Sequence, residues 1–290
     1  MNTGAHQPRE YSREVRGVRL AWREWGNRDA YPVLALHGWL DNAASFDTLA
    51  PLLGERRIIA LDLPGHGLSA HRGVDGTYNI WDDLPTLMHF TAALDLERYD
   101  LLGHSRGAAI ASLLAAAEVP AVSSLVMLDG ALIPLLEGPQ TLQQLRSFTH
   151  DYAKRSSRDA PVFPDVEAAI TARCTATGID PRAARLLVPR SLDPVAGGFR
   201  WRTDPRLRYA SALKFTRAQV RNILSGITVP TLIFTTGAGM ARRLPRHGAL
   251  DWYPGLQRET VEGCHHCHML EAAPVIAERV GRLWRECGQA

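Results

Sequence analysis

Short runs of apolar residues recur along the first half of the chain and alternate with stretches of helical spacing. Residues 32–38 (PVLALHG) and 99–105 (YDLLGHS) are apolar over the length of a strand, whereas residues 81–96 repeat apolar positions at helical intervals. This alternation is typical of βαβ units that build a mostly parallel sheet. It also predicts strands at 18–25, 57–63 and 123–130, a helix across 44–53 and a small-residue helix after Ser105.

The strand pattern stops after Asp129 and returns only at residue 229. A connection of that length without structure of its own is uncommon in a compact domain. We therefore predict a helical insertion, with helices at residues 139–155, at 164–177, after the Asp180 and Pro181 pair, and at 217–225.

Strands resume at residues 229–236 and 257–263, and the chain ends in a helix with an apolar face. The predicted organisation is an α/β core from residues 1–130 and 229–290, interrupted by a lid or cap at residues 131–228 between the sixth and seventh strands. The residues expected on the apolar face of the last helix are Val275, Ile276, Val280, Leu283 and Trp284.

Composition places the chain among ordinary globular proteins, because 46% of its 290 residues are hydrophobic and 22% are charged. The first 17 residues lack the apolar core of a signal peptide, and no apolar run approaches the roughly 20 residues that span a bilayer. Four cysteines are too few for a disulfide scaffold. We expect a cytoplasmic protein with reduced cysteines that neither spans nor binds a membrane.

The net charge of +3 hides an uneven distribution. Residues 130–228 contain 15 Lys/Arg and 8 Asp/Glu, whereas the rest of the chain contains 18 and 22. A solvated basic surface explains this excess, and selection of an anionic acyl substrate is the alternative. Aromatic residues lie among the arginines of residues 199–209, but the small overall charge argues against a nucleic-acid partner.

The sequence GHSRG at residues 103–107 fits the pattern G-x-S-x-G between a predicted strand and a predicted helix. A sharp turn from strand to helix exposes the central serine, and Gly103 and Gly107 leave room for that turn. Ser105 would then lie at the carboxyl end of the sheet, where open α/β sheets bind ligands. This context predicts that Ser105 is a nucleophile.

A serine nucleophile in acyl chemistry also needs donors for the oxyanion of the tetrahedral intermediate. The backbone N–H of Arg106 follows the nucleophile at a helix N-terminus, and we expect its side chain to be structural. The second predicted donor is the backbone N–H of Trp39, because Gly38 allows that backbone to approach closely.

Four segments together resemble the α/β-hydrolase fold, and more narrowly its serine hydrolase-like branch. The likeness covers residues 15–135 and 195–286, whereas residues 136–195 match no family pattern. It implies a central parallel sheet flanked by helices and a catalytic triad in the order serine, acid, histidine. The segments are HGWLDNAASFDTLAPLL, LDLPGHGLSAH, LLGHSRGA and VEGCHHCHMLE.

The resemblance implies Ser105 as nucleophile and His265 as base, because G-x-H after the last strand is the position of the histidine in this superfamily. Relatives usually carry the acid soon after the strand at 229–236, but the loop GAGMARRLPRHGAL has none. Asp129, at the end of the sixth strand, occupies the alternative position. Asp251 comes too late in the chain, and Asp41 is a weaker candidate.

The stretch CHHCH at residues 264–268 permits other interpretations, since C-x-x-C-H is also a haem attachment signature. A haem would need an export route, structural zinc would need a second ligand cluster, and a redox dithiol would need a thioredoxin-like unit. We therefore interpret His265 as catalytic and His268 as a supporting residue, and we expect neither a metal nor a cofactor.

The predicted function is hydrolysis of a carboxylic ester or thioester through an acyl-enzyme on Ser105. A serine in place of aspartate disfavours epoxide hydrolase and haloalkane dehalogenase chemistry, which needs a carboxylate nucleophile. Acyl transfer or carbon–carbon hydrolysis on the same triad remains open. So does a ligand sensor or scaffold with little turnover. The expected partner is a small molecule, and the oligomeric state is open.

Overall fold

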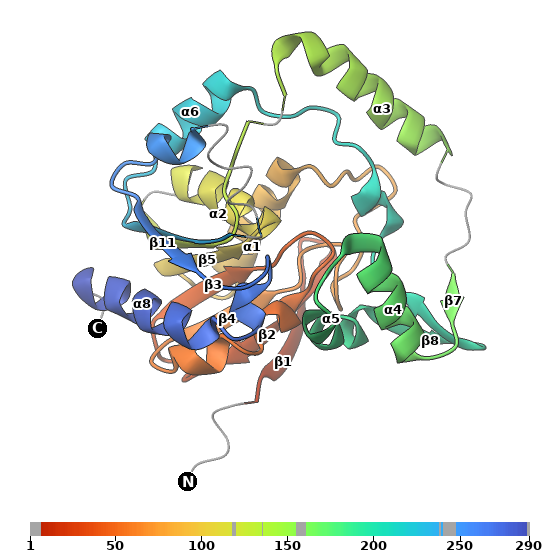
Figure 1. Cartoon of the computed structure of the whole chain (residues 1–290), viewed down its shortest axis with the longest axis horizontal. Helices are drawn as coiled ribbons and strands as arrows, with labels where there is room; N and C mark the ends of the chain where they lie inside the picture. Colours follow the sequence, from red (N-terminus) through yellow and green to blue (C-terminus); the bar gives the residue numbers. More distant parts are fainter. Residues whose placement is uncertain are drawn as a thin grey trace.

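The structure is a computed structural model that describes residues 7–117, 120–134, 136–154, 161–237, 239 and 248–288. Its centre is an eight-stranded sheet of order β1-β2-β4-β3-β5-β6-β10-β11, in which β2 pairs antiparallel with β1 and β4 and the other neighbours are parallel. The predicted, mostly parallel α/β sheet is confirmed (Figure 1). Its strands are β1 (Arg9–Val15), β2 (Val18–Trp25), β3 (Pro32–Leu36), β4 (Arg57–Leu61), β5 (Tyr99–His104), β6 (Val122–Leu128), β10 (Thr231–Thr236) and β11 (Gln257–Val261).

Helices cover both faces of this sheet. On one face, α1 (Asp83–Ala93), α2 (Arg106–Ala117) and α6 (Arg217–Ser225) contribute to one buried apolar cluster. On the other face, α8 (Ala273–Glu286) packs with short 3-10 helices at Ala43–Phe46 and Ala50–Leu53. The central strands β3, β5 and β6 are apolar on both sides because both faces are covered.

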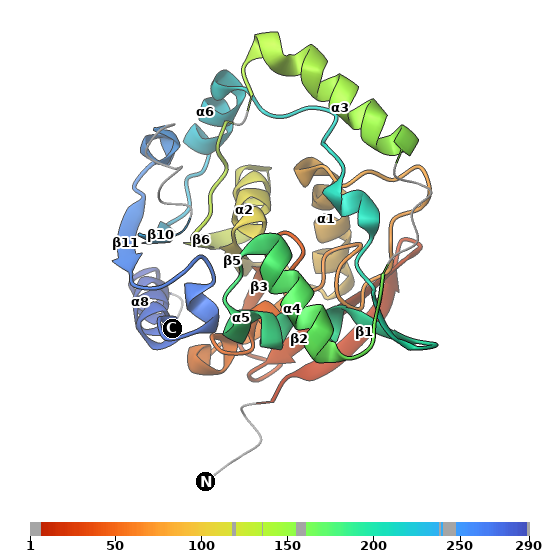
Figure 2. The same ribbon diagram turned by 45° about the vertical axis from the view of Figure 1, so that its right-hand side comes forward.

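The segment between β6 and β10 interrupts the main sheet between its sixth and seventh strands in chain order. It contains α3 (Thr141–Lys154), α4 (Val166–Thr177) and α5 (Pro181–Leu187) before α6. Figures 1 and 2 show α3 standing apart from α4 and α5 at the top of both views. A third apolar cluster joins α4 and α5 to Met269 of the core, so this part of the insertion has its own packed interior.

The structure differs from the sequence predictions in four elements. The insertion is not purely helical, because β7 (Val162–Phe163), β8 (Leu192–Val195) and β9 (Gly198–Trp201) form a small antiparallel sheet. The helix expected across 44–53 is two 3-10 helices, and β1 has no counterpart among the predicted strands. On α8, Val275 is 51% exposed while Ile276 is fully buried, so the apolar face excludes Val275. Arg155, the end of the helix expected at 139–155, lies outside the described residues.

Candidate active site

Ser105 lies between β5 and α2, at the carboxyl end of the sheet. Its φ of 52° is in the left-handed region, which a residue other than glycine rarely adopts. The backbone around it is packed tightly, because a Cβ atom on Gly130 would lie 2.4 Å from Ser105 Cα and one on Gly107 would lie 2.0 Å from Leu36 O. Gly103 is restricted in the same way by Ala108. These glycines permit the sharp turn that presents the serine.

Asp129 follows β6 immediately and is fully buried, with a φ of 43°. One of its carboxylate oxygens, Oδ1, accepts a hydrogen bond of 3.0 Å from the backbone N–H of Thr236 at the end of β10. The other oxygen, Oδ2, lies 2.6 Å from Nδ1 of His265. Asp129 is therefore fixed by the neighbouring strand and directed at the histidine.

His265 lies in the loop between β11 and α8, and its side chain is 32% exposed. Its Nδ1 atom contacts Asp129, and its Nε2 atom lies 2.8 Å from Oγ of Ser105. The structure thus brings the three residues expected from the sequence into one continuous hydrogen-bonded chain. In such an arrangement an imidazole can take the serine proton while the carboxylate orients and stabilises the imidazolium.

Of the two residues expected to supply oxyanion donors, Arg106 directly follows Ser105, and Trp39 lies in the loop after β3, which pairs with β5. Arg106 begins α2, where backbone N–H groups lack intrahelical partners. Its guanidinium forms an ion pair of 2.9 Å with buried Asp83 and donates to the carbonyl of Tyr78, which is a structural use of the side chain. Trp39 follows β3 and donates from its indole Nε1 to the carbonyl of Leu207 in the insertion.

The alternative acids are paired with residues other than His265. Asp251 is paired with Arg258 at 2.7 Å, and both side chains are about half exposed or more. Asp41 is buried and faces two other histidines, His104 and His266. Among the described residues, Asp129 is the carboxylate that the structure joins to the catalytic histidine candidate.

A buried group of histidines lies behind the triad, and the sequence patterns did not identify it. His104, the variable residue before Ser105 in G-x-S-x-G, has its ring 4.7 Å from that of His265 and 4.3 Å from that of His268. Its Nε2 atom donates to the backbone carbonyl of His265 at 3.0 Å. His268 is fully buried, and its Nε2 atom lies 3.2 Å from Oγ of Ser45, which links the loop of His265 to the 3-10 helix at Ala43–Phe46.

Burial dominates the electrostatics of this group. It lowers the pKa of His104 to about 4 and lowers the pKa of His268 well below its usual range, since charging a buried imidazole is costly. Burial acts to raise the pKa of Asp41, but the nearby His266 and His104 outweigh it and hold that pKa well below the usual range. The group therefore combines the neutral rings of His104 and His268 with an ionised carboxylate on Asp41.

The cysteines of the CHHCH stretch are not bonded to each other. Cys264 and Cys267 are free thiols, and burial raises the pKa of Cys267 to about 12. A thiol with that pKa stays protonated at neutral pH, whereas redox catalysis and zinc ligation both use the thiolate. The burial and raised pKa of Cys267 therefore give no support to a redox dithiol.

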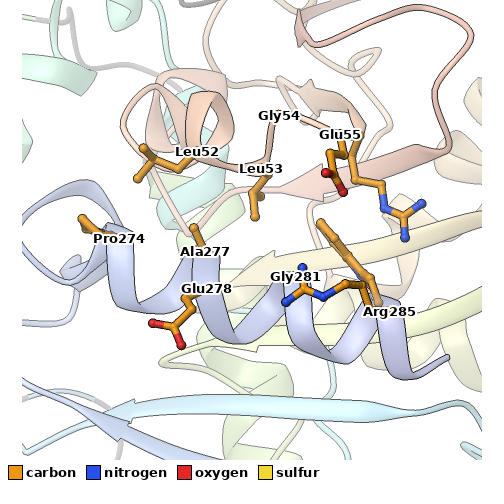
Figure 3. A pocket seen from close by; sticks show the side chains of 11 residues that line it. Leu52, Leu53, Gly54, Glu55, Pro274, Ala277, Glu278, Gly281 and Arg285 are labelled. Carbon is orange, nitrogen blue, oxygen red and sulfur yellow. The ribbon is translucent and has the colours of Figure 1, made fainter. Parts of the chain in front are cut away.

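Two hollows lie away from the triad. One, of about 470 Å³, is formed by residues 52–56 and α8 (Figure 3). The other, of about 690 Å³, lies between residues 19, 69–71 and the β8–β9 hairpin. Neither is lined by Ser105, Asp129 or His265. The site is therefore located by the hydrogen-bonded side chains.

Among the described residues, no helix has the length and apolar character to cross a bilayer.

Comparison with known proteins identifies the family. A family model described as the alpha/beta hydrolase fold matches residues 31–236. A serine hydrolase-like protein of Dictyostelium discoideum is 31% identical over 271 residues, covering 87% of this chain and 75% of that protein. A serine hydrolase-like protein of Danio rerio is 28% identical over 278 residues, covering 90% and 83%.

Solved structures agree with this assignment. A hypothetical protein of Pseudomonas aeruginosa PAO1 has 38% identity and a TM-score of 0.88, with 96% of this chain and 98% of that chain covered. The thioesterase domain from the curacin biosynthetic pathway has 25% identity and a TM-score of 0.84, with 95% and 99% covered. The chain therefore belongs to the α/β-hydrolase fold family and, within it, to the serine hydrolase-like branch.

Proposed function

We propose that this protein is a serine hydrolase that cleaves a carboxylic ester or thioester through an acyl-enzyme intermediate. The observation that carries the proposal is the continuous chain from Ser105 Oγ to His265 Nε2 at 2.8 Å, and from His265 Nδ1 to Asp129 Oδ2 at 2.6 Å. A ligand sensor on the same fold would not need this alignment. The intact chain therefore favours turnover over binding alone.

In the proposed mechanism, Ser105 Oγ attacks the substrate carbonyl carbon as its proton moves to Nε2 of His265. The backbone N–H groups of Arg106 and Trp39 would hold the resulting oxyanion. Collapse of the intermediate breaks the bond to the leaving alcohol or thiol, which takes the proton from His265. A water molecule, deprotonated by the same imidazole, then releases the acid and restores Ser105.

Asp129 would act through His265 and would not exchange the proton itself. Its buried carboxylate favours the tautomer with the proton on Nδ1, which leaves Nε2 free to accept the serine proton. It also compensates the positive charge that develops on the ring. The hydrogen bond from the Thr236 N–H fixes the carboxylate in this orientation.

The insertion at residues 131–228 would act as a lid over Ser105 and determine the range of substrates. Several of its charged and polar groups dock onto the loops around the site. Arg190 contacts buried Asp62 at 2.9 Å, and Arg173 contacts Asp41 at 3.1 Å. Since core carboxylates neutralise these two arginines, we assign the basic excess mainly to docking and to a solvated surface. Selection of an anionic substrate is the alternative.

The direct test is labelling and turnover of the purified protein. A fluorophosphonate probe should label the wild type at Ser105, and the Ser105→Ala variant should not be labelled. A panel of p-nitrophenyl esters and acyl thioesters of different chain length should reveal which acyl group is hydrolysed. A folded wild-type protein that is neither labelled nor active on any of these compounds would rule out the hydrolase.

A further inference from the structure

Three potential metal-ligand atoms converge in the buried group behind the triad, and in the structure the one on His266 donates a hydrogen bond to Asp41. They are Oδ2 of Asp41, Nδ1 of His104 and Nε2 of His266, and all lie within 4.8 Å of one another. The distances from Asp41 Oδ2 are 3.3 Å to the His104 atom and 3.2 Å to the His266 atom. Tetrahedral ligation by Zn²⁺ at about 2.0–2.1 Å requires ligand atoms roughly 3.4 Å apart. Two of the three separations are therefore already close to those of a metal site.

His104 directs Nδ1 at the Asp41 carboxylate, 3.3 Å away. Nε2 of His104 contacts a carbonyl oxygen, which only accepts, so the proton of the ring is on Nε2. The unprotonated Nδ1 then faces the Asp41 carboxylate, which is also an acceptor. No hydrogen bond is made by Nδ1 among the described residues, and the side chain is fully buried.

We propose that Asp41, His104 and His266 form a binding site for a divalent transition metal ion, with Zn²⁺ as the expected occupant. A cation between the three atoms would resolve the contact between two acceptors, because each would donate a lone pair to it. Imidazole and carboxylate ligands suit Zn²⁺, Cu²⁺ and Ni²⁺, and three protein ligands leave a fourth position for water.

The residues around the site leave room for this ion and determine the net charge of the site. Gly38 borders the site, since a Cβ atom there would lie 2.7 Å from Asp41 Oδ2 and 2.8 Å from His104 Nδ1. Arg173 binds the other carboxylate oxygen, Oδ1, at 3.1 Å and leaves Oδ2 directed at the histidines. The guanidinium opposes a second cation, so we expect moderate affinity. Access is through His266, whose side chain is 11% exposed.

Metal binding would act on the triad through two links. His104 holds the backbone carbonyl of His265 at 3.0 Å, and His266 is the next residue in the chain. A metal ion that draws these two ligands together would therefore restrict or displace His265. We expect Zn²⁺ to inhibit ester hydrolysis without entering the triad. This consequence rests on the proposed function, whereas metal binding itself does not.

Binding is measured on full-length protein, with any affinity tag removed and bound metal extracted with a chelator. Competition with a chromophoric chelator should give one equivalent of Zn²⁺, and Co²⁺ should produce visible d–d bands. His266→Gln should weaken Zn²⁺ binding by at least about 10- to 100-fold, the range seen when only an outer-shell partner of a metal site is lost. His150→Gln is the matched control, because His150 is 59% exposed on α3 and its variant should bind as the wild type does.

A double variant, Cys264→Ser with Cys267→Ser, distinguishes this site from a thiolate site in the same loop. It should retain Zn²⁺ affinity and the Co²⁺ spectrum of the wild type. The activity of each variant with Zn²⁺ is compared with the activity of the same variant without metal. The inhibition by Zn²⁺ should disappear in His266→Gln. The proposal is overturned if the wild type binds Zn²⁺ with a Kd weaker than about 1 mM, if His266→Gln binds normally, or if the double cysteine variant loses the metal.

Discussion

Oδ2 of Asp129 lies 2.6 Å from Nδ1 of His265, although 136 positions separate the two residues in the chain. Parallel strands β6 and β10 and the parallel pair β10 and β11 carry the two residues to the same edge of the sheet. Asp129 is held there by the Thr236 N–H. The proposed acid thus follows the sixth strand, β6, and the seventh strand, β10, supplies a backbone donor that holds the acid in place.

Asp129→Asn should lower kcat by about 10⁴-fold, because an amide in this place stabilises the wrong tautomer of His265. The fold should be retained, since the amide oxygen can still accept from Thr236. Steady-state hydrolysis of an active p-nitrophenyl ester and circular dichroism check the two expectations. Asp251→Asn is the control and should have wild-type activity. If Asp129→Asn keeps a kcat comparable to that of the wild type, Asp129 is excluded as the acid.

Gly239→Ala should also reduce activity, through Asp129. A Cβ atom on Gly239 would lie 1.8 Å from Asp129 Oδ2, so either the loop or the carboxylate must move. A misplacement of about 1 Å in such a site can cost about 10²-fold in rate. We expect a fall in kcat of that order, with the melting temperature showing that the protein remains folded. Gly237→Ala is matched to it, because a Cβ atom there meets nothing within 4 Å. Equal kcat values for the two variants would contradict this explanation.

The fold was predictable because its central strands are buried on both faces. β3 is a continuous apolar run and β5 is mostly apolar for that reason, and the glycines of GHSRG marked the turn between β5 and α2. β1 was missed because its sequence, REYSREV, is mostly polar and exposed at the sheet edge. The short strands of the insertion were missed because they form a sheet of their own, separate from the main one.

The candidate site was predictable where a local pattern marks it. Ser105 and His265 follow strands within recognisable motifs, and Asp129 emerged because the usual loop lacks an acid. The contact of His104 with Asp41 and His266 has no such signal, since Asp41 and His266 are 225 positions apart. Such a cluster depends on the packing of two loops, which carry Asp41 and His266, against the end of β5, which carries His104.

Asp100 should make stability depend on pH. This carboxyl is fully buried, it accepts a 2.6 Å hydrogen bond from Ser124, and burial raises its pKa to about 6. Because the folded pKa lies above the unfolded value of about 3.9, the folded state binds more protons between these values. Its contribution to stability is therefore complete below about pH 4 and is lost as pH rises through about 6.

Asp100→Asn removes this titration. The free energy of unfolding of the variant minus that of the wild type should be larger at pH 8 than at pH 4, by about 2 kcal/mol, because only the wild type loses stability over this range. Urea denaturation at the two pH values measures it, and any pH-independent cost of the substitution cancels. The exposed Asp75→Asn variant is the control. A difference of zero, or one of opposite sign, would show that Asp100 is ionised normally in the folded protein.

Arg190 should be the strongest single link between the insertion and the core. Its side chain is 4% exposed and forms ion pairs with Asp62 at 2.9 Å and Glu10 at 2.7 Å. Removing one partner of a buried pair leaves the other charge uncompensated, so Arg190→Gln should lower the free energy of unfolding by about 3 kcal/mol. Arg185→Gln, at the exposed pair with Glu167, should leave stability unchanged. Asp62 also accepts hydrogen bonds from the backbone N–H groups of Ala43 and Leu68. Equal denaturation midpoints for the two variants would mean that these two donors stabilise Asp62 sufficiently and that Arg190 is dispensable.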